Sequence, residues 1–182
     1  KFGNLPGKGK SYTISDAKKS IEDSLKRLRR DSLNVLFIHN PRDEIDDYGE
    51  IFKLFDDLKN DGVIKYSGLS MAKDFNYHGK VDINRFDVLQ NDINILHLDP
   101  LKLNINKNIV LMVRSPLASG ILSGKMNEET IFPIEDHRSQ WLTGDRLKSI
   151  LKRVEVINTQ FSEYDLPSLS CRFLLNNNLI GK

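Results

Sequence analysis

Short runs of apolar residues alternate with longer segments of helical periodicity along this chain. The runs predict four strands, at about 34–39, 64–69, 86–90 and 109–113. Because these runs are apolar at nearly every position, we expect both faces of each strand to be buried, which is typical of parallel strands covered by helices. The pattern therefore predicts one parallel sheet, in which a helix follows each strand on the outside and the crossovers are right-handed.

Apolar residues spaced three and four positions apart predict amphipathic helices between and after these strands. The first helix follows Ser15 as its N-cap, and the second spans about 48–59 and stops at Gly62. The third spans about 145–160, and Asp165 caps a fourth. The residues expected to face the core are Ala17, Ile21, Leu25 and Leu28 in the first helix, Ile51, Phe52, Leu54, Phe55 and Leu58 in the second, Leu147, Ile150, Leu151, Val154 and Ile157 in the third, and Leu169, Phe173 and Leu174 in the fourth.

Three stretches carry weaker patterns. Residues 74–80 form a broken helical pattern, and residues 101–105 are predicted as helix because the order of elements requires a crossover. Residues 123–144 combine glycine, proline and clustered charges, and they predict a long surface loop over the mouth of a barrel. We find no internal repeat, linker or low-complexity segment, so we expect a single domain over residues 1–182.

The composition narrows the classes of function. The 27 basic and 25 acidic residues give a formal net charge of +2, which offers no electrostatic argument for nucleic acid or an anionic membrane as a partner. Basic residues between 18 and 30 alternate with Glu22 and Asp23, as on a solvated helix face. The lone Cys171 excludes an internal disulfide, and its apolar neighbours predict a buried side chain. Without a signal peptide or a long apolar run in the sequence, we expect a cytoplasmic protein.

Polar residues stand where each predicted strand ends. The first three ends carry His39-Asn40, Ser70 and Gln90-Asn91, and the fourth strand ends in Arg114. A loop of small residues, Ser115 to Gly120, follows, and its backbone amides are suited to approach a phosphate. Because the carboxyl ends of parallel strands meet at one edge, this repetition is how a (β/α) barrel builds an active site.

Four segments resemble consecutive signatures of the aldo-keto reductase family. They read SIEDSLKRLRRDSLNVLFIHNP, GVIKYSGLS, FDVLQNDIN and RSPLASGILSGK, in the family's order and at roughly its spacing, and FPIEDHRS also suits members of this group. The resemblance covers nearly the whole chain and implies an α/β fold, the TIM (β/α)8 barrel. Because such a barrel needs about 250 residues, it also implies that the chain is truncated at both ends, with about half of the barrel strands present.

The resemblance implies an oxidoreductase that reduces an aldehyde or ketone to the alcohol by hydride transfer. Lys1 matches the lysine whose ammonium lowers the pKa of the family's acidic tyrosine, and His39 matches the histidine that orients the substrate carbonyl. The family's aspartate and tyrosine would lie upstream of Lys1, since Tyr12 and Tyr48 stand in the wrong places. We therefore expect the given chain alone to be inactive. The alternative is a catalytically inactive relative that binds the cofactor as a regulatory module.

The resemblance also implies a nicotinamide cofactor, NADP(H) or alternatively NAD(H). Matching residues hydrogen-bond the nicotinamide carboxamide, although Met71 stands where many members have asparagine. Arg114 occupies the position at which many members stack an aromatic ring, and a planar guanidinium serves the same purpose. The residues expected to contact the cofactor are Ser70, Gln90 and Asn91 at the carboxamide, Arg114 at the ring, and Ser115, Leu117 and Ser119 along the pyrophosphate.

Rival sites fit the sequence less well. Gly9-Lys10-Ser11 resembles the end of a P-loop, but it lacks the first glycine at the required spacing and a preceding strand. Ser123 lies one place late for the nucleophile elbow of a hydrolase. His97 and His137 have no partners at metal spacing, so we expect no metal site. The expected partner is a small carbonyl substrate, and the sequence carries no signal for an oligomeric state.

Overall fold

The computed structural model of the chain describes residues 1–5, 7, 9–71, 81–178 and 180. The described chain forms two compact units. The first contains Lys1–Asn91 and Asn104–Met112, and the second contains Asp92–Leu103 and Val113–Ile180. The helical pattern predicted at 74–80 lies outside the described residues.

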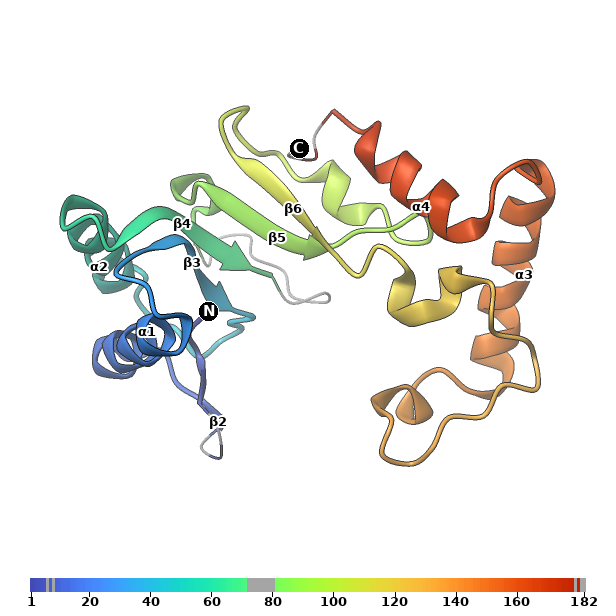
Figure 1. The fold of residues 1–182 in the computed structure, drawn as a ribbon, viewed down its shortest axis with the longest axis horizontal. Helices are drawn as coiled ribbons and strands as arrows, with labels where there is room; N and C mark the ends of the chain where they lie inside the picture. The colour runs from blue at the N-terminus through green and yellow to red at the C-terminus, as the bar shows by residue number, and fades with distance from the viewer. Residues whose placement is uncertain (6, 8, 72–80, 179, 181–182) are drawn as a thin grey trace. The chain divides into compact units, whose positions relative to one another are not determined.

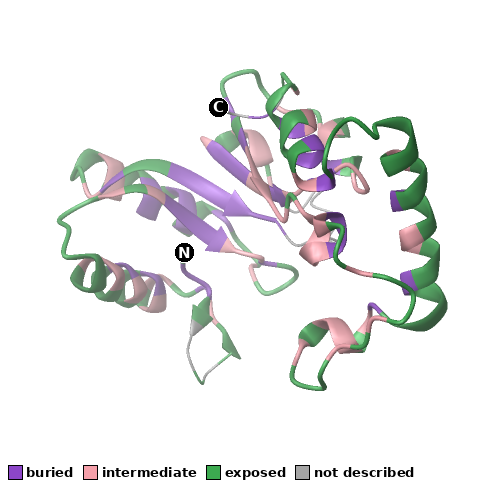
Figure 2. Cartoon of the chain, turned by 45° about the vertical axis from the view of Figure 1, so that its right-hand side comes forward, coloured by how far each residue is buried: buried purple, intermediate pink, exposed green. Residues whose placement is uncertain are grey.

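A four-stranded sheet has its strands in the order β3-β4-β5-β6 (Figure 1). The pairs β3–β4 and β4–β5 are parallel, which confirms the predicted parallel sheet. Most residues of β4 and β5 are buried, whereas most residues of the long helix α3 are exposed (Figure 2). The bounds are β3 (Leu33–His39), β4 (Ile64–Ser70), β5 (Val88–Asp92), β6 (Val110–Arg114) and α3 (Gly144–Gln160).

The β5 strand starts two residues later than predicted. Phe86 instead closes a short 3-10 helix, Ile83–Arg85, and its ring packs 5.1 Å from that of Phe52 and 6.2 Å from that of Phe55, measured between centroids. Its burial against these rings explains why an apolar residue stands just outside the strand. The pattern of apolar positions could not distinguish a residue of a buried strand from a residue that packs against neighbouring rings just before the strand begins.

Two helices of the first unit, α1 (Ile14–Leu28) and α2 (Gly49–Asn60), lie side by side (Figure 1). The predicted N-cap of α1 is wrong, because Thr13 caps this helix and accepts a hydrogen bond from the backbone N–H of Asp16 at 3.2 Å. Leu28 is also not a core residue, since it is 60% exposed in the last turn. The α2 helix buries four of its five predicted core residues.

A short antiparallel hairpin, which the pattern did not predict, precedes α1. Its strands are β1 (Asn4–Leu5) and β2 (Gly9–Lys10). Ahead of it, Phe2 lies parallel to Ile38 in β3, and their backbones are joined by hydrogen bonds from Phe2 N–H to Phe37 O and from His39 N–H to Phe2 O. The hairpin thus joins a residue paired with β3 to the start of α1.

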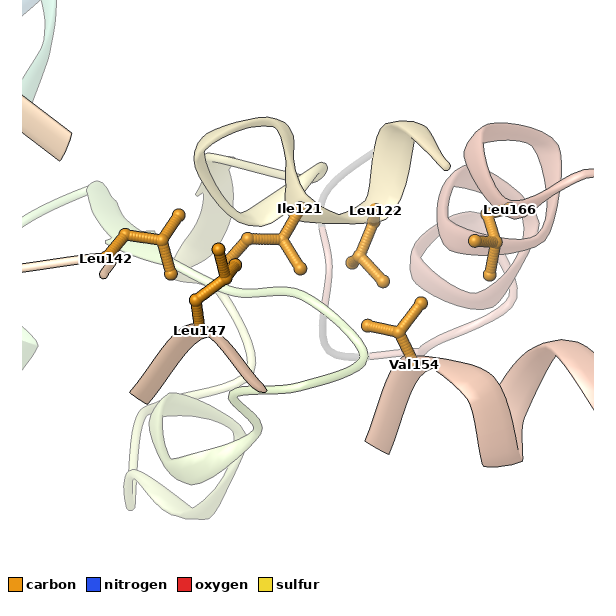
Figure 3. Packing of buried hydrophobic residues seen from close by; sticks show 6 residues of the cluster. All are labelled: Ile121, Leu122, Leu142, Leu147, Val154 and Leu166. Atoms are coloured by element: carbon orange, nitrogen blue, oxygen red, sulfur yellow. The ribbon is translucent and has the colours of Figure 1, made fainter. Parts of the chain in front are cut away.

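The core of the second unit lies between α3, α4 (Leu166–Leu175) and the 3-10 helix η3 (Ala118–Ser123). Asp165 caps α4 by accepting from Ser168 N–H at 3.0 Å, as predicted. Cys171, on the same helix, is exposed, so its predicted burial is wrong. The buried cluster in Figure 3 consists of Ile121, Leu122, Leu142, Leu147, Val154 and Leu166.

The predicted helix at 101–105 is also wrong. Only Asp99–Lys102 forms a helix there, and it is a single 3-10 turn. The apolar residues Leu101, Leu103 and Ile105 alternate with period two, which gives no apolar face to an α-helix. The predicted loop at 123–144 is irregular, apart from the end of η3 and the short 3-10 helix η4 (His137–Gln140). Among the described residues, no helix is both long and apolar enough to cross a membrane.

Candidate active site

The carboxyl ends of β3, β4 and β5 bring three of the predicted site residues into one row. His39 is the register partner of Ser70, and Ser70 is the register partner of Gln90. Because the pairing is parallel, all three residues lie at the same edge of the sheet. The sequence analysis predicted that these residues lie together, because each of them stands at the end of a predicted strand.

Lys1 lies against two members of this row. Its ammonium Nζ donates to Ser70 Oγ at 3.1 Å and to Gln90 Oε1, and it lies 5.5 Å from the centre of the Phe37 ring. The next residue, Phe2, pairs its backbone with β3, which explains how Lys1 reaches the strand ends. The predicted catalytic lysine and two predicted cofactor residues therefore form one hydrogen-bonded cluster.

Ser70 and Gln90 offer donors and acceptors of the kind that a planar carboxamide requires. The buried hydroxyl of Ser70 lies 3.2 Å from Asn40 Oδ1 and 3.3 Å from Gln90 Oε1. Its single hydrogen atom can be donated to either of these oxygens. Gln90 Nε2 donates to the thioether sulfur of Met112 at 3.2 Å. Because a thioether is a weak acceptor, a ligand carbonyl would be a stronger partner for this amide.

Asn91 and Met71 lie next to each other. Both are buried, and Asn91 Nδ2 donates to Met71 Sδ at 3.6 Å. The methionine that stands where many family members have asparagine thus contacts the predicted amide at position 91. This pair explains how an apolar residue is accommodated at position 71.

His39 is half-buried at the end of β3, and its backbone is held on both sides. Its N–H donates to Phe2 O at 2.8 Å, and its carbonyl accepts from the hydroxyl of Tyr12 at 2.8 Å. Sequence reasoning set Tyr12 aside because it does not stand where the family's acid would. No sequence signal pointed to its contact with His39, since the two residues are 27 positions apart.

In the second unit, Arg114 and Ser115 share one carboxylate. Arg114 donates from Nε to Asp92 Oδ1 at 3.0 Å and from Nη2 to Oδ2 at 3.1 Å, and Ser115 Oγ donates to Oδ1 at 2.7 Å. This two-point pairing fixes the plane of the guanidinium. Asp92 was missed, although it directly follows the polar pair at the end of β5 and could have been found there.

The small-residue loop after β6 adopts the left-handed backbone conformation at several positions. The φ angles are +56° at Ser115, +48° at Ala118, +57° at Ser119 and +92° at Gly120. Such a run turns successive backbone N–H groups toward one side, as anion-binding loops do. The N–H groups of Ala118 and Gly120 already donate within the loop, to Ser115 O and Leu117 O at 2.9 Å each. A phosphate would therefore have to use other amides of this loop.

A second loop holds this turn in place. Arg138 donates from Nη1 to Ser119 O at 3.2 Å and from Nη2 to Asp136 Oδ2 at 2.5 Å. The hydrogen bonds from the side chain and the backbone of Arg138 lower the pKa of Asp136 to about 2. Beside them lies an open surface hollow of about 640 Å³, lined by Ser119, Pro133, Glu135, Asp136, His137 and Arg138. The described residues contain no cluster of three or more side chains suited to hold a metal ion.

A parallel α/β sheet with polar residues at the carboxyl ends of its strands is the arrangement on which α/β proteins, barrels among them, build their active sites. Within that class, the profile of the aldo/keto reductase family matches residues 1–180, so the chain belongs to this family. The uncharacterized oxidoreductase YcsN from Bacillus subtilis (strain 168) is 32% identical over 108 residues, which make up 56% of this chain and 36% of that protein.

Two solved structures share the fold. The glycerol dehydrogenase AKR11B4 from Gluconobacter oxydans superposes with a TM-score of 0.75 at 23% identity, covering 94% of this chain and 55% of that one. The holo form of the aldo-keto reductase AKR11C1 from Bacillus halodurans superposes with a TM-score of 0.69 at 21% identity, covering 98% of this chain and 58% of that one. The sheet and its helices therefore represent part of a TIM barrel, and the chain spans little more than half of these structures.

Proposed function

We propose that the whole protein that carries this chain is an NAD(P)H-dependent oxidoreductase that reduces a small aldehyde or ketone to the alcohol. One observation carries the proposal: the ammonium of Lys1 contacts both Ser70 and Gln90 at the ends of parallel strands. Membership of the aldo/keto reductase family supports the proposal. The resemblance of the sequence assigns Lys1 to the family's catalytic lysine and Ser70 and Gln90 to its carboxamide contacts.

Each residue of the cluster has a distinct role in this proposal. His39 donates a hydrogen bond to the substrate carbonyl and orients it, while Lys1 lowers the pKa of the acid that protonates the forming alkoxide. Ser70, Gln90 and Asn91 bind the carboxamide. A bound nicotinamide would supply the hydride.

The family resemblance gives the remaining cofactor roles to the last residue of β6 and to the loop that follows it in the sequence. The guanidinium of Arg114, held flat by Asp92, suits stacking on the nicotinamide ring. Ser115, Leu117 and Ser119 would line the pyrophosphate. We propose NADP(H) as the cofactor, with NAD(H) as the alternative, and a cytoplasmic location stays a prediction from the sequence.

Calorimetry with NADPH and NADH on the whole protein tests cofactor binding. Replacing Gln90 with alanine removes one proposed partner of the carboxamide and one partner of Lys1, whose ammonium keeps its contact with Ser70, so we expect binding to weaken by about 1–3 kcal/mol. Gln160→Ala, at the exposed end of α3, is the matched control and should bind like the wild type. If the wild-type protein binds neither dinucleotide, the proposal is wrong. Binding without reduction of any aldehyde or ketone would favour the inactive regulatory relative.

A further inference from the structure

The hairpin between Gly3 and Tyr12 returns the chain to the end of β3. There, two of its residues donate hydrogen bonds to consecutive backbone carbonyls. The hydroxyl of Tyr12 donates to His39 O at 2.8 Å, and Lys10 Nζ donates to Asn40 O at 2.9 Å. Lys10 also pairs with Glu44 Oε1 at 2.9 Å, which keeps its ammonium on this turn.

The peptide between His39 and Asn40 is thereby held from two sides. Its carbonyl accepts from Tyr12, and its N–H donates to Ser70 O at 2.8 Å. Asn40 has a φ of +46°, in the left-handed region that few residues other than glycine and asparagine adopt readily. Because rotation of this peptide would turn the backbone that carries His39, these contacts determine where the imidazole lies.

The ring of Tyr12 contacts the segment that carries Lys1. The side chain is 7% exposed, and it lies so close to Gly3 that a Cβ there would stand 2.3 Å from Tyr12 Cε1. Gly3 also has a φ of +110°, so both its backbone and this contact require glycine. The buried Tyr12 therefore contacts the backbone at two places, at Gly3, two residues after Lys1, and at His39.

We propose that Tyr12 is a positioning residue for His39, and that Lys10 supports it by holding the next carbonyl. The hydroxyl of Tyr12 acts through the backbone of His39, and it is not the acid of the reaction. This inference rests on the proposed function, because it assigns to Tyr12 the orientation of the histidine that binds the substrate carbonyl.

Tyr12→Phe in the whole protein tests the inference, since it keeps the ring on Gly3 and removes only the donor. We expect kcat to fall roughly tenfold, because small displacements of a reacting group have large effects on rate. The dissociation constant for NADPH should change less than about threefold, because the donor that is lost bonds the backbone of His39 and one lost hydrogen bond has a modest net effect. In the cofactor-free protein, the imidazole NMR signals of His39 should shift and broaden.

Tyr48→Phe is the matched control, because it removes the hydroxyl of another buried tyrosine, at the start of α2. It should leave kcat and the His39 signals as in the wild type. If Tyr12→Phe lowers only the melting temperature and leaves both readouts unchanged, the inference is wrong.

Lys10→Met gives a second, independent variant in case Tyr12→Phe does not fold. Lys10 is exposed, so its loss should leave the fold intact, and we expect a smaller shift of the His39 signals. Unchanged signals and unchanged kcat in this variant would also overturn the inference. If the wild-type protein reduces no carbonyl compound, the proposed function fails, whereas the NMR signals still decide the role of Tyr12.

Discussion

Gly68 shows how the size of a single residue determines the packing of two strands. A Cβ at this position of β4 would lie 2.4 Å from Cδ1 of Phe37, its register partner on β3. The aromatic ring therefore lies over the space that a side chain would occupy. This contact keeps Phe37 beneath the ammonium of Lys1, at 5.5 Å from the ring centre to Nζ.

We expect Gly68→Ala to lower the free energy of unfolding by about 1–3 kcal/mol, the usual effect of overpacking a buried position. Urea unfolding of the whole protein measures the change. Gly49→Ala, in the first turn of α2, is the control, because the three atoms nearest to its Cβ, at 3.0 to 3.6 Å, all belong to the side chain of Asp47 and not to a packed ring. A similar stability for the two variants would contradict the packing argument.

Among the elements, the loop from 131 to 141 contains an ion pair between Asp136 and Arg138. Above about pH 4, the ordinary pKa of an aspartate, Asp136 is ionised and paired with Arg138. Because pairing lowers its pKa to about 2, the stabilisation is fully present above pH 4 and is lost as the pH falls through about 2. We expect protonation of Asp136 to remove the ion pair that holds Arg138, and so to loosen the hydrogen bond from Arg138 to the carbonyl of Ser119.

Trp141, the single tryptophan, reports on this loop, since its ring lies 6.4 Å from that of His137 and near Arg146. We expect its fluorescence to change as the pH falls through about 2 in the wild type, and Asp136→Asn to show the changed fluorescence already at pH 5. Glu135→Gln, the neighbouring carboxyl, should behave like the wild type. Circular dichroism over the same range separates this change from global acid unfolding. A wild-type response in Asp136→Asn would contradict the role of the pair.

The elements also show which patterns suffice for prediction. All four strands were predicted to within two residues at each end, because short apolar runs are typical of strands in a parallel sheet. The predicted burial of both faces is wrong for β6, where Val110 is exposed and only Leu111 is fully buried. The hairpin β1–β2 was missed, since two-residue strands carry no periodicity. Residues 101–105 were misassigned because topology, and not their own alternation, was used to choose a helix.

For the whole molecule, the decisive measurement is turnover by the whole protein. His39→Ala should lower kcat/KM for a carbonyl substrate by roughly 10²–10⁴, the range for a positioned proton-handling group. The chain of 182 residues is expected to show no turnover by itself, because the family resemblance assigns none of its residues to the acidic tyrosine. Reduction of a carbonyl substrate by this chain alone would contradict the roles assigned to Lys1 and His39.

The sequence by itself determined the parallel sheet, the polar strand ends and the family. These features are local, because each depends on a run of residues whose burial or spacing has one common structural cause. The row of His39, Ser70 and Gln90 followed from them, since parallel strands of similar length end at the same edge.

Only the tertiary structure decided which side chains support this row. The contact of Tyr12 with His39, the shared carboxylate of Asp92 and the link from Arg138 to Ser119 each join residues separated by about 20 positions or more. Such contacts depend on where hairpins and loops return in space. A tyrosine, an aspartate or an arginine in an irregular segment has many possible partners, and the pattern of apolar positions does not distinguish among them.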